Sequence, residues 1–487
     1  MISYTSYGFF LLVSAGLILS GFVRPKRKKW ILLAMSLIFL AMAGGALSIW
    51  IWMISTAAGF AAAFLLERDL AGRRLILALA AVFQLGLLAY FKYANLPFYT
   101  MEALCDITGR SYEFEPVRRP AVLGISFYTL MIIGYDLDVY RGERQAVRSA
   151  ADFSLFTGYF GHLVQGPVDS YEVTGTSLAK PDSVSFEGFR DGCLEILTGL
   201  FKKLIISERL AIMVNTIYGE YTSYKGWYLA LAAGAFSLQL YTDFSGCMDL
   251  MSGISRLFGV RLCGNFRQPF FAESVSEFWR RWHITLGGFL RKNIYIPLGG
   301  NRKGLLRKYV NVMAVFFISG LWHGGKWTFI IGTGILQGIY MIGEELFRPA
   351  AQRIGRAAGV KTDTPFFSWI RRLRTFILVS VGFVLFRADS LAMAGQVLGG
   401  IMQKGQHSEY GEGVFYSGLG TGDFAVLVIG LAVLFFLSVW RENHGEEKII
   451  KGDGARTGTC FAVLFLILLF GWYGKGYDMG AFIYSRF

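Results

Sequence analysis

The chain has 487 residues, of which 54% are hydrophobic and only 17% are charged. Its mean hydropathy of +0.45 is too high for a soluble globular protein, so we expect an integral membrane protein. The formal net charge of +14 comes from basic residues spread among loops beside apolar runs. Such a distribution sets membrane topology and binds anionic lipid headgroups, and it argues against a nucleic-acid-binding protein.

Repeated apolar runs predict an all-α membrane protein. A spanning helix needs about 20 apolar residues, so the longer runs predict spans and the shorter ones predict tilted, broken or re-entrant helices. We expect about 11 transmembrane helices in a single polytopic membrane domain over residues 1–487. The runs cover residues 7–23, 30–47, 49–66, 75–91, 122–139, 193–206, 227–240, 309–321, 327–341, 376–386, 424–439 and 461–472.

Residues 1–95 are expected to form an N-terminal helical block. No basic residue precedes its first run, and the sequence RPKRKK follows that run at residues 24–29. A cleaved signal peptide has the opposite polarity, so the run predicts an anchor whose N-terminus lies outside the cytoplasm. The next two runs turn at Leu47-Ser48 and return to the charged residues 67–74, which places both basic loops in the cytoplasm.

Residues 92–120 are expected to be a polar loop, and the span after them ends in YDLDVYRGERQ. Asp136 and Asp138 are interpreted as carboxylates at the membrane interface, beside arginines. Residues 153–168 are too short and too glycine-rich to span, so we expect a re-entrant or interfacial segment. Its His162 is interpreted as a hydrogen-bonded structural histidine, with a cavity-lining role as the alternative.

A later apolar run continues into the sequence YTDFSG, which contains Tyr241 and Asp243. Buried polar groups at such depth must be paired or hydrated. Two interpretations stay open, a helix capped or broken at residues 243–246 and a cavity-lining segment. The five cysteines are odd in number and lack CxxC spacing, so neither a disulfide framework nor a metal site is indicated.

The central segment, residues 277–329, carries two of the five histidines. Residues 277–290 place aromatic side chains at helical spacing, with Arg280, Arg281 and His283 among them. This pattern is typical of a helix that lies at the membrane interface with a charged face. A membrane-surface helix is therefore the simpler interpretation of these residues. Two other histidines, His407 and His444, lie in polar loops and are expected to be solvated.

The next stretch, RKNIYIPLGGNRKG, predicts a helix end and a tight turn. Pro297 ends the preceding helix, and the Gly-Gly-Asn sequence after it requires special backbone geometry. Arg291, Lys292 and Arg302 flank this turn. Cations beside exposed backbone amides suit a phosphate or pyrophosphate, although no Walker spacing is present.

Residues 309–321 are apolar but too few to cross a bilayer, and the run stops at Trp322-His323-Gly324-Gly325. The His323 imidazole is therefore expected inside the membrane, at the end of a partial helix. A histidine at that depth is costly, which favours a functional role over simple packing. An imidazole can take a proton from a hydroxyl and release it at neutral pH.

The motifs WRRWHITL, YIPLGGNR and LWHGGKWTF resemble those of the membrane-bound O-acyltransferases, particularly the bacterial branch with alginate O-acetyltransferase membrane subunits. LGISFYT, DVYRGE, QGPV, YTDFSG, NFRQPF and the C-terminal FIYSRF fit the same family. The resemblance covers residues 120–487, with the catalytic region at 277–329. It implies a ring of helices around a central funnel, where a tunnel lets a cytoplasmic acyl donor meet an acceptor on the other side.

By this resemblance, His323 acts as general base on an acceptor hydroxyl that attacks an acyl thioester. His283 would support it by orienting substrate or stabilising charge. Two departures leave the donor contacts and the acceptor open. Arg291-Lys292-Asn293 stands where the family has an acidic residue after the arginine, and Gly161-His162 replaces a Pro-Gln pair. The implied substrate-binding residues are Trp282, Arg291, Asn301, Arg302, Trp322, Tyr241 and Asp243.

The resemblance implies an O-acyltransferase of the cell membrane. It would move an acetyl or similar short acyl group from acyl-CoA or an acyl carrier protein to a hydroxyl of an extracytoplasmic polysaccharide or cell-wall polymer. An extracytoplasmic polysaccharide-modifying partner is implied, and no bound cofactor. The alternative within the family is D-alanyl transfer to teichoic acid. From other classes, a transporter of an anionic solute and a scaffold for polysaccharide export remain open, because broken helices are common in transporters.

Overall fold

The computed structural model describes residues 3–68, 71–110, 112–359, 361, 364–403, 417–445 and 449–473. These residues form helices and their connections, and the one extended pairing among them is an isolated bridge between Phe266 and Trp282. The all-α prediction is confirmed for this part of the chain. His407 and the FIYSRF motif at 482–487 lie outside the described residues.

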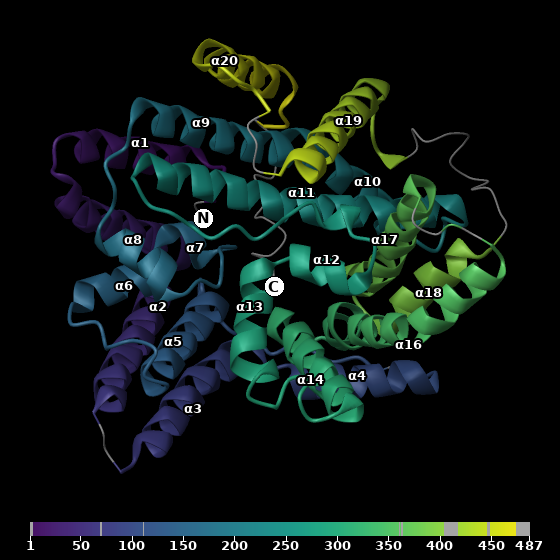
Figure 1. The fold of residues 1–487 in the computed structure, drawn as a ribbon, viewed down its shortest axis with the longest axis horizontal. Coiled ribbons are helices and arrows are strands. Elements are labelled where there is room, and N and C mark those ends of the chain that lie inside the picture. Colours follow the sequence, from purple (N-terminus) through teal and green to yellow (C-terminus); the bar gives the residue numbers. More distant parts are fainter. Residues whose placement is uncertain are drawn as a thin grey trace.

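The N-terminal block contains α1 (Tyr7–Gly21), α2 (Lys28–Glu67) and α3 (Arg73–Lys92), at one end of the molecule in Figure 1. α2 is kinked at Gly45, where φ is 71° and ψ is −177°. Glycine adopts this backbone without the steric cost that a Cβ would add. The turn predicted at Leu47-Ser48 therefore falls slightly earlier, at Gly45.

The predicted loop at residues 92–120 is partly wrong, because it contains the helix α4 (Leu96–Thr108). Phe98 of this helix stacks on Phe114 with ring centroids 5.3 Å apart. The hydroxyl of Thr100 accepts a hydrogen bond of 2.9 Å from the indole N–H of Trp327. These contacts stabilise a short helix whose own composition does not predict it.

Long helices cross the middle of the molecule. α11 (Trp227–Leu257) lies beside α9 (Phe186–Leu200), which continues through a π-helical turn at Phe201–Ser207 into α10 (Glu208–Gly219). A Cβ added at Gly199 would lie only 2.5 Å from the carbonyl oxygen of Gly246, so small residues allow this close approach. α11 runs through residues 243–246 without a break, so the alternative of a helix broken there is wrong.

Buried ion pairs explain why α11 stays intact. Lys203 Nζ lies 2.6 Å from a carboxylate oxygen of Asp243 and 2.7 Å from one of Glu208. The neighbouring Lys202 pairs with Asp249 at 2.6 Å. The Asp243 side chain has no exposed surface, so the ammonium group of Lys203 compensates a carboxylate that water does not reach.

The centre of Figure 1 holds α12 (Val275–Arg281), α13 (Ile284–Leu290) and α14 (Leu305–His323). The single interfacial helix predicted over 277–290 is wrong, since the chain breaks at Trp282-His283 between α12 and α13. Its aromatic residues are buried among protein side chains, with Phe278 and Trp282 in one cluster. Packing against neighbouring helices, not an interface with lipid, explains their helical spacing.

α14 also differs from the prediction of a partial helix. It has 19 residues and is long and apolar enough to cross a membrane, although His323 does lie at its end as predicted. Lys308 in its first half pairs with Glu345 of a neighbouring helix, which lets the helix begin before the apolar run. Five segments of the described chain meet the same length and composition criteria: Pro25–Glu67, Arg73–Lys92, Leu305–His323, Thr421–His444 and Asp453–Phe470.

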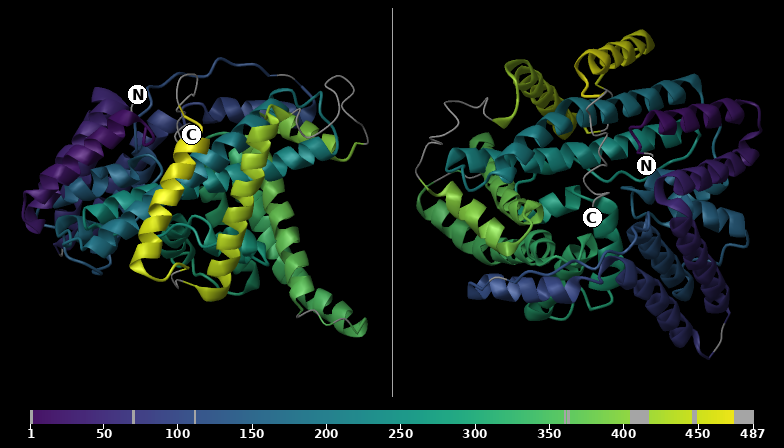
Figure 2. Two further views of the ribbon diagram at one scale, coloured as in Figure 1. Left: turned by 90° about the horizontal axis from the view of Figure 1, so that it is seen from above. Right: turned by 180° about the vertical axis from the view of Figure 1, so that it is seen from behind.

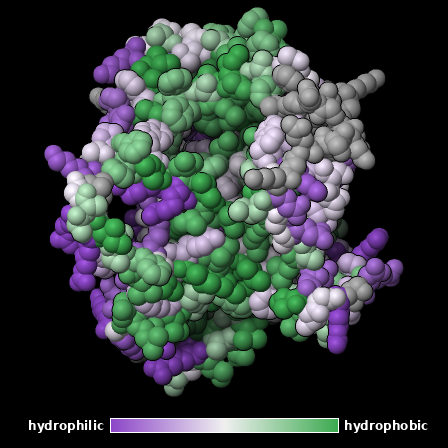
Figure 3. All heavy atoms as spheres, turned by 90° about the vertical axis from the view of Figure 1, so that its right-hand side faces the viewer, coloured by the Kyte–Doolittle hydropathy of each residue, from purple (hydrophilic) through white to green (hydrophobic). Residues whose placement is uncertain are grey.

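The peripheral helices complete the fold. Figure 2 (left) shows α4 and the chain after it at the upper face, and α16 reaching the lower face. Figure 3 shows a broad hydrophobic surface with hydrophilic residues at its left edge and lower right, as expected of a multi-pass membrane protein. The helices not yet given are α5 (Ile125–Tyr140), α6 (Ala150–Gly158), α7 (Phe160–Leu163), α8 (Thr176–Ala179), α15 (Trp327–Phe329), α16 (Leu336–Ala357), α17 (Pro365–Arg387), α18 (Leu391–Ile401), α19 (Thr421–His444) and α20 (Asp453–Phe470).

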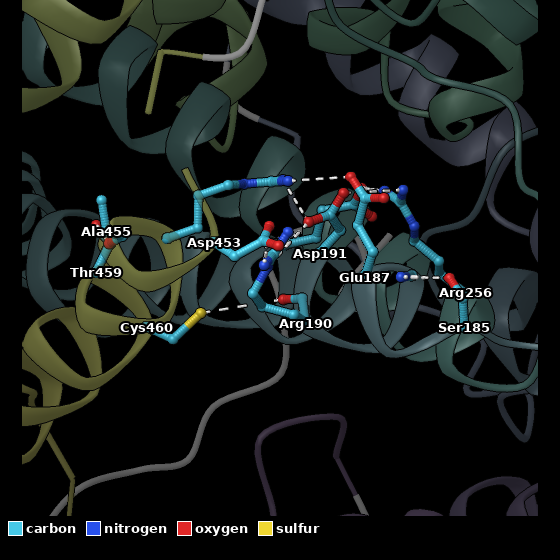
Figure 4. Close-up of polar contacts among 12 residues, drawn as sticks. Ser185, Glu187, Arg190, Asp191, Arg256, Asp453, Ala455, Thr459 and Cys460 are labelled. Atoms are coloured by element: carbon cyan, nitrogen blue, oxygen red, sulfur yellow. Dashed lines mark hydrogen bonds and ion pairs between the residues drawn. The ribbon is translucent and has the colours of Figure 1, made fainter. Parts of the chain in front are cut away.

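An ion-pair network attaches α20 to α9 (Figure 4). Arg190 Nη1 lies 2.6 Å from Asp453 at the start of α20. Asp191 pairs with Arg456 of α20 and, at 3.3 Å, with Arg256 of α11. The network therefore fixes the last described helix against the central pair α9 and α11.

Candidate active site

His283 lies between α12 and α13 in the left-handed backbone region, with φ 45° and ψ 53°. This conformation costs free energy for a residue with a Cβ, so surrounding contacts must hold it. The side-chain oxygen of Asn265 accepts hydrogen bonds from the Thr285 backbone N–H (3.1 Å) and hydroxyl (2.7 Å). The antiparallel bridge between Phe266 and Trp282 adds a second attachment. The 265–266 segment thus fixes His283 from both sides.

His323 ends α14, and two other helices fix that end. The indole N–H of Trp322 donates to the Ser126 carbonyl at 3.1 Å. Lys92, the last residue of α3, donates to the Trp322 carbonyl at 2.8 Å and to the Ser126 hydroxyl at 3.0 Å. A cation at the carboxyl end of a helix is also favourable for the helix dipole. The position of His323 therefore depends on α3 and α5 as well as on α14.

Both histidines pack against the same indole ring, that of Trp322. The His283 ring centroid is 5.7 Å from the Trp322 ring, and the His323 ring centroid is 5.1 Å from it. Both imidazoles are buried, with 2% and 4% of their surface exposed. Phe244 packs on His283 at 5.0 Å and Phe386 on His323 at 5.4 Å. Both imidazoles are therefore shielded from bulk water.

A small cavity lies beside the His283 segment. Its volume is about 110 Å³, and its lining includes Tyr241, Asn265, Lys202 and Arg441. The Tyr241 ring is 6.2 Å from Trp282, whose own ring stacks on Phe278. Three of the predicted substrate-binding residues lie in this region: Trp322 contacts both imidazoles, Trp282 directly precedes His283, and Tyr241 packs near Trp282 and lines the cavity.

Other predicted contacts lie elsewhere. Arg291, Asn301 and Arg302 are exposed on the segment between α13 and α14. Asp243 is buried in an ion pair with Lys203. The predicted special turn is present, with φ of 105° at Gly299 and 56° at Gly300. Its carbonyl at Gly300 accepts a hydrogen bond of 2.9 Å from Asn311. The roles assigned to the three exposed residues remain predictions.

Lys292 and Asn293, which follow Arg291 where the resemblance implies an acidic residue, form contacts of their own. Lys292 lies 2.6 Å from both Asp138 and Glu143. Arg141 donates a hydrogen bond of 2.8 Å to the side-chain oxygen of Asn293. The cation that replaces the family's acidic residue is thus matched by carboxylates at the end of α5.

Asp136 differs from the sequence interpretation in its surroundings, whereas His162 is buried in the interior, as a structural histidine would be. Asp136 was expected at the membrane interface, but it is 2% exposed because α5 packs against α2 and α3. His162 on α7 is fully buried, and its ring packs against Tyr159 at 5.6 Å. Both side chains belong to the interior around α5 and α7.

Sequence reasoning missed three residues that position the histidines, Lys92, Ser126 and Asn265. Lys92 directly follows an apolar run, and such a cation is a detectable signal of a role at the membrane. Ser126 and Asn265 lie in the LGISFYT and NFRQPF motifs. Nothing local in those motifs shows which distant residue each one contacts.

Comparisons with known proteins identify the family. The sequence model described as MBOAT, membrane-bound O-acyltransferase family, matches residues 140–386. The probable alginate O-acetylase AlgI of Pseudomonas putida is 34% identical over 382 residues, which cover 76% of this chain and 74% of that protein. The chain belongs to the membrane-bound O-acyltransferase family.

Two further relatives of this membrane-bound O-acyltransferase are named for other polymers. The peptidoglycan O-acetyltransferase of Helicobacter pylori is 32% identical over 356 residues, 68% of this chain and 65% of that protein. The teichoic acid D-alanyltransferase of Streptococcus thermophilus is 23% identical over 288 residues, 54% of this chain and 68% of that protein. The chain is accordingly an O-acyltransferase, and its relatives support O-acetylation of a polymer.

Asn265 offers a test of how His283 is held in this membrane-bound O-acyltransferase. Asn265→Ala removes the acceptor for Thr285, and the resulting displacement of His283 should lower kcat about 100-fold. Asn265→Asp keeps an acceptor oxygen and should retain more activity. Thioester turnover at saturating donor, measured on equal amounts of folded protein, checks both variants. A wild-type kcat in Asn265→Ala would show that the Asn265 side chain does not position His283.

Proposed function

We propose that this protein transfers an acetyl or similar short acyl group from a cytoplasmic thioester to a hydroxyl of an extracytoplasmic polysaccharide or cell-wall polymer. The supporting observation is the pair of buried histidines that both pack against the Trp322 indole, one between α12 and α13 and one at the end of α14. Relatives named for alginate and peptidoglycan acetylation support a polymer as the acceptor.

The proposed setting is the cell membrane, with about 11 transmembrane helices around a central funnel. Basic residues in the connections favour the cytoplasmic side. By this rule, RPKRKK at residues 24–29 and the lower ends of α16 and α17 in Figure 2 (left) face the cytoplasm. α4 lies at the opposite face. The cavity at Tyr241 includes Arg441 near the end of α19, and this end of the helix is also at the lower face.

The donor therefore approaches His283 from the cytoplasmic side. Acyl-CoA or an acyl carrier protein would place its acyl group near Tyr241 and Trp282. The exposed Arg291, Asn301 and Arg302 supply cations and an amide for the phosphate of either donor. Asp243 supports this region through its ion pair with Lys203 rather than by contact with substrate.

The chemistry follows from the histidine pair. His323 takes the proton of the acceptor hydroxyl as its oxygen attacks the thioester carbonyl carbon. The carbon–sulfur bond breaks, an ester forms, and the departing thiolate receives the proton from His323. His283 orients the donor carbonyl or stabilises its developing negative charge. Contact with the Trp322 ring fixes the positions of both imidazoles. An extracytoplasmic partner transferase would take part by bringing the polymer hydroxyl to this site.

The D-alanyl alternative is tested by donor choice. Purified protein in lipid nanodiscs is incubated with acetyl-CoA, acetylated carrier protein or D-alanylated carrier protein, together with a glycan hydroxyl acceptor. We expect free thiol release and new acetyl ester, detected by mass spectrometry, from an acetyl donor. Turnover of the D-alanyl donor alone would assign the chain to alanylation. Stable thioesters with every donor would contradict acyl transfer and favour the transporter or scaffold interpretation.

A further inference from the structure

A second, larger pocket lies at the opposite face from the Tyr241 cavity. Its volume is about 480 Å³, within the roughly 300–1,000 Å³ of small-molecule sites. Its lining comes from α4, from the segment after it and from the turns that follow α14 and α17. The residues that matter here are Tyr99, Glu102, Tyr112, Glu113, Lys326 and Asp389.

This pocket is attached to the turn that follows His323. Lys326, three residues after His323, is part of its lining. The next residue, Trp327, donates its indole hydrogen bond to Thr100 of α4 at 2.9 Å. The Asn95 side chain exchanges hydrogen bonds with the backbone of Val117 at 3.1 and 2.7 Å, which holds the segment after α4 in place. The pocket is therefore held beside the turn that follows His323.

The topology places the pocket outside the cytoplasm. α3 leaves the charged residues 67–74, which the positive-inside rule assigns to the cytoplasm, and crosses to Lys92. The residues that follow α3 therefore lie on the far side, as α4 does in Figure 2 (left). That is the side from which the acceptor must reach His323.

Aromatic rings form one wall of the pocket. Phe114 packs against Tyr99 at 5.4 Å and against Tyr112 at 5.9 Å, and it stacks on Phe98. The faces of such rings carry partial negative charge. They pack well against the C–H groups that cover one face of a sugar ring, and phenolic hydroxyls add hydrogen-bonding groups.

The charges of the lining exclude some ligands. Three carboxyl groups, on Glu102, Glu113 and Asp389, and one ammonium group, on Lys326, line the pocket, with the Asp389 side chain 80% exposed. Lys326 lies 3.4 Å from Asp389, so part of its charge is already compensated. Burial raises the pKa of Glu102, Asp106 and Asp389 raise it further, and Lys326 opposes them. Carboxyl groups accept hydrogen bonds from hydroxyls, but they repel a polyanion.

We propose that this pocket, beside the turn that follows His323, binds an uncharged saccharide unit of the acceptor polymer. That the ligand is the acyl acceptor rests on the proposed function. That it is an uncharged saccharide rests on the lining of the pocket alone. A chain of uronic acids would place one carboxylate per sugar against the carboxyl groups of the lining. A neutral hexose or N-acetylhexosamine brings hydroxyls and C–H faces without that repulsion.

Direct binding tests the proposal without relying on turnover. The probes are a hexamer of N-acetylglucosamine and a hexamer of mannuronic acid, each titrated against the full chain in nanodiscs with saturation-transfer NMR. We expect the neutral hexamer to bind and the acidic one to bind at least about tenfold more weakly. Tyr112→Ala and Glu113→Gln should each raise the Kd for the neutral hexamer about tenfold. Glu115→Gln is the matched control, since Glu115 is exposed on the same segment and does not line the pocket.

The outcomes separate this inference from the proposed function. Neutral binding that the pocket variants weaken and His323→Ala leaves intact would support the pocket, even if thioester turnover failed and the acyl-transfer proposal fell. Tighter binding of the acidic hexamer, or equal Kd values in all variants, would overturn the pocket while leaving acyl transfer unaffected. If neither hexamer bound but the variants lost association with an extracytoplasmic partner protein, the pocket would be a protein-docking site and the proposal would be wrong.

Discussion

His323→Ala should reduce acyl transfer by about 10²- to 10⁴-fold, the range expected when a general base is removed. His323 is 4% exposed at the end of α14, so no water molecule in bulk solution takes over its role directly. The measurement is the rate of free thiol release from the acyl donor in the presence of an acceptor hydroxyl. Thermal unfolding in the same detergent confirms that the variant is folded.

His444→Gln is the matched control for that variant. His444 is exposed near the end of α19, where its ring stacks on Trp440 at a centroid distance of 4.0 Å. Its replacement should leave the rate of thiol release unchanged. A wild-type rate in His323→Ala would mean that another group accepts the proton, whereas loss of activity in both variants would point to general damage.

Asp243→Ala should destabilise the protein strongly. It leaves the ammonium group of Lys203 buried with Glu208 alone, and breaking a buried ion pair costs about 3–5 kcal/mol. We expect the midpoint of thermal unfolding to fall by roughly 5–10 °C, because each kcal/mol shifts the midpoint of a large domain by a few degrees. Circular dichroism of the purified protein measures this shift.

Asp182→Asn gives the comparison for an exposed pair. Asp182 and Arg261 form an ion pair at 3.0 Å, but both side chains are more than half exposed. Exposed pairs contribute little, so this midpoint should match the wild type within error. An unchanged midpoint in Asp243→Ala would show that the buried pair does not stabilise α11.

The order of the motifs and the local sequence pattern were sufficient to predict the family, the all-α class and the position of His323 at a helix end. These features depend on residues that are close in sequence. α4 was missed because it forms by packing on Phe114 and Trp327. The continuity of α11 depends on Lys203, which is 40 residues away from Asp243 in the chain. Such long-range pairing leaves no periodic signal.

The candidate site was predicted in part for the same reason. The intramembrane cost of a histidine and the family motifs selected His283 and His323, and the structure brings both to Trp322. The left-handed backbone at His283 was not predictable, because contacts from Asn265 and Phe266 hold it. The family resemblance and their charge beside the Gly-Gly-Asn turn selected Arg291 and Arg302, and the structure leaves both exposed.

The most direct test of the central claim is the amount of polymer-bound O-acetyl ester in cells. Cells that lack the gene are complemented with wild type, His323→Ala or His283→Ala at matched membrane levels of protein. The account predicts acetyl esters with wild type, their loss with His323→Ala and a strong reduction with His283→Ala. Full acetylation with both variants would contradict acyl transfer at this histidine pair.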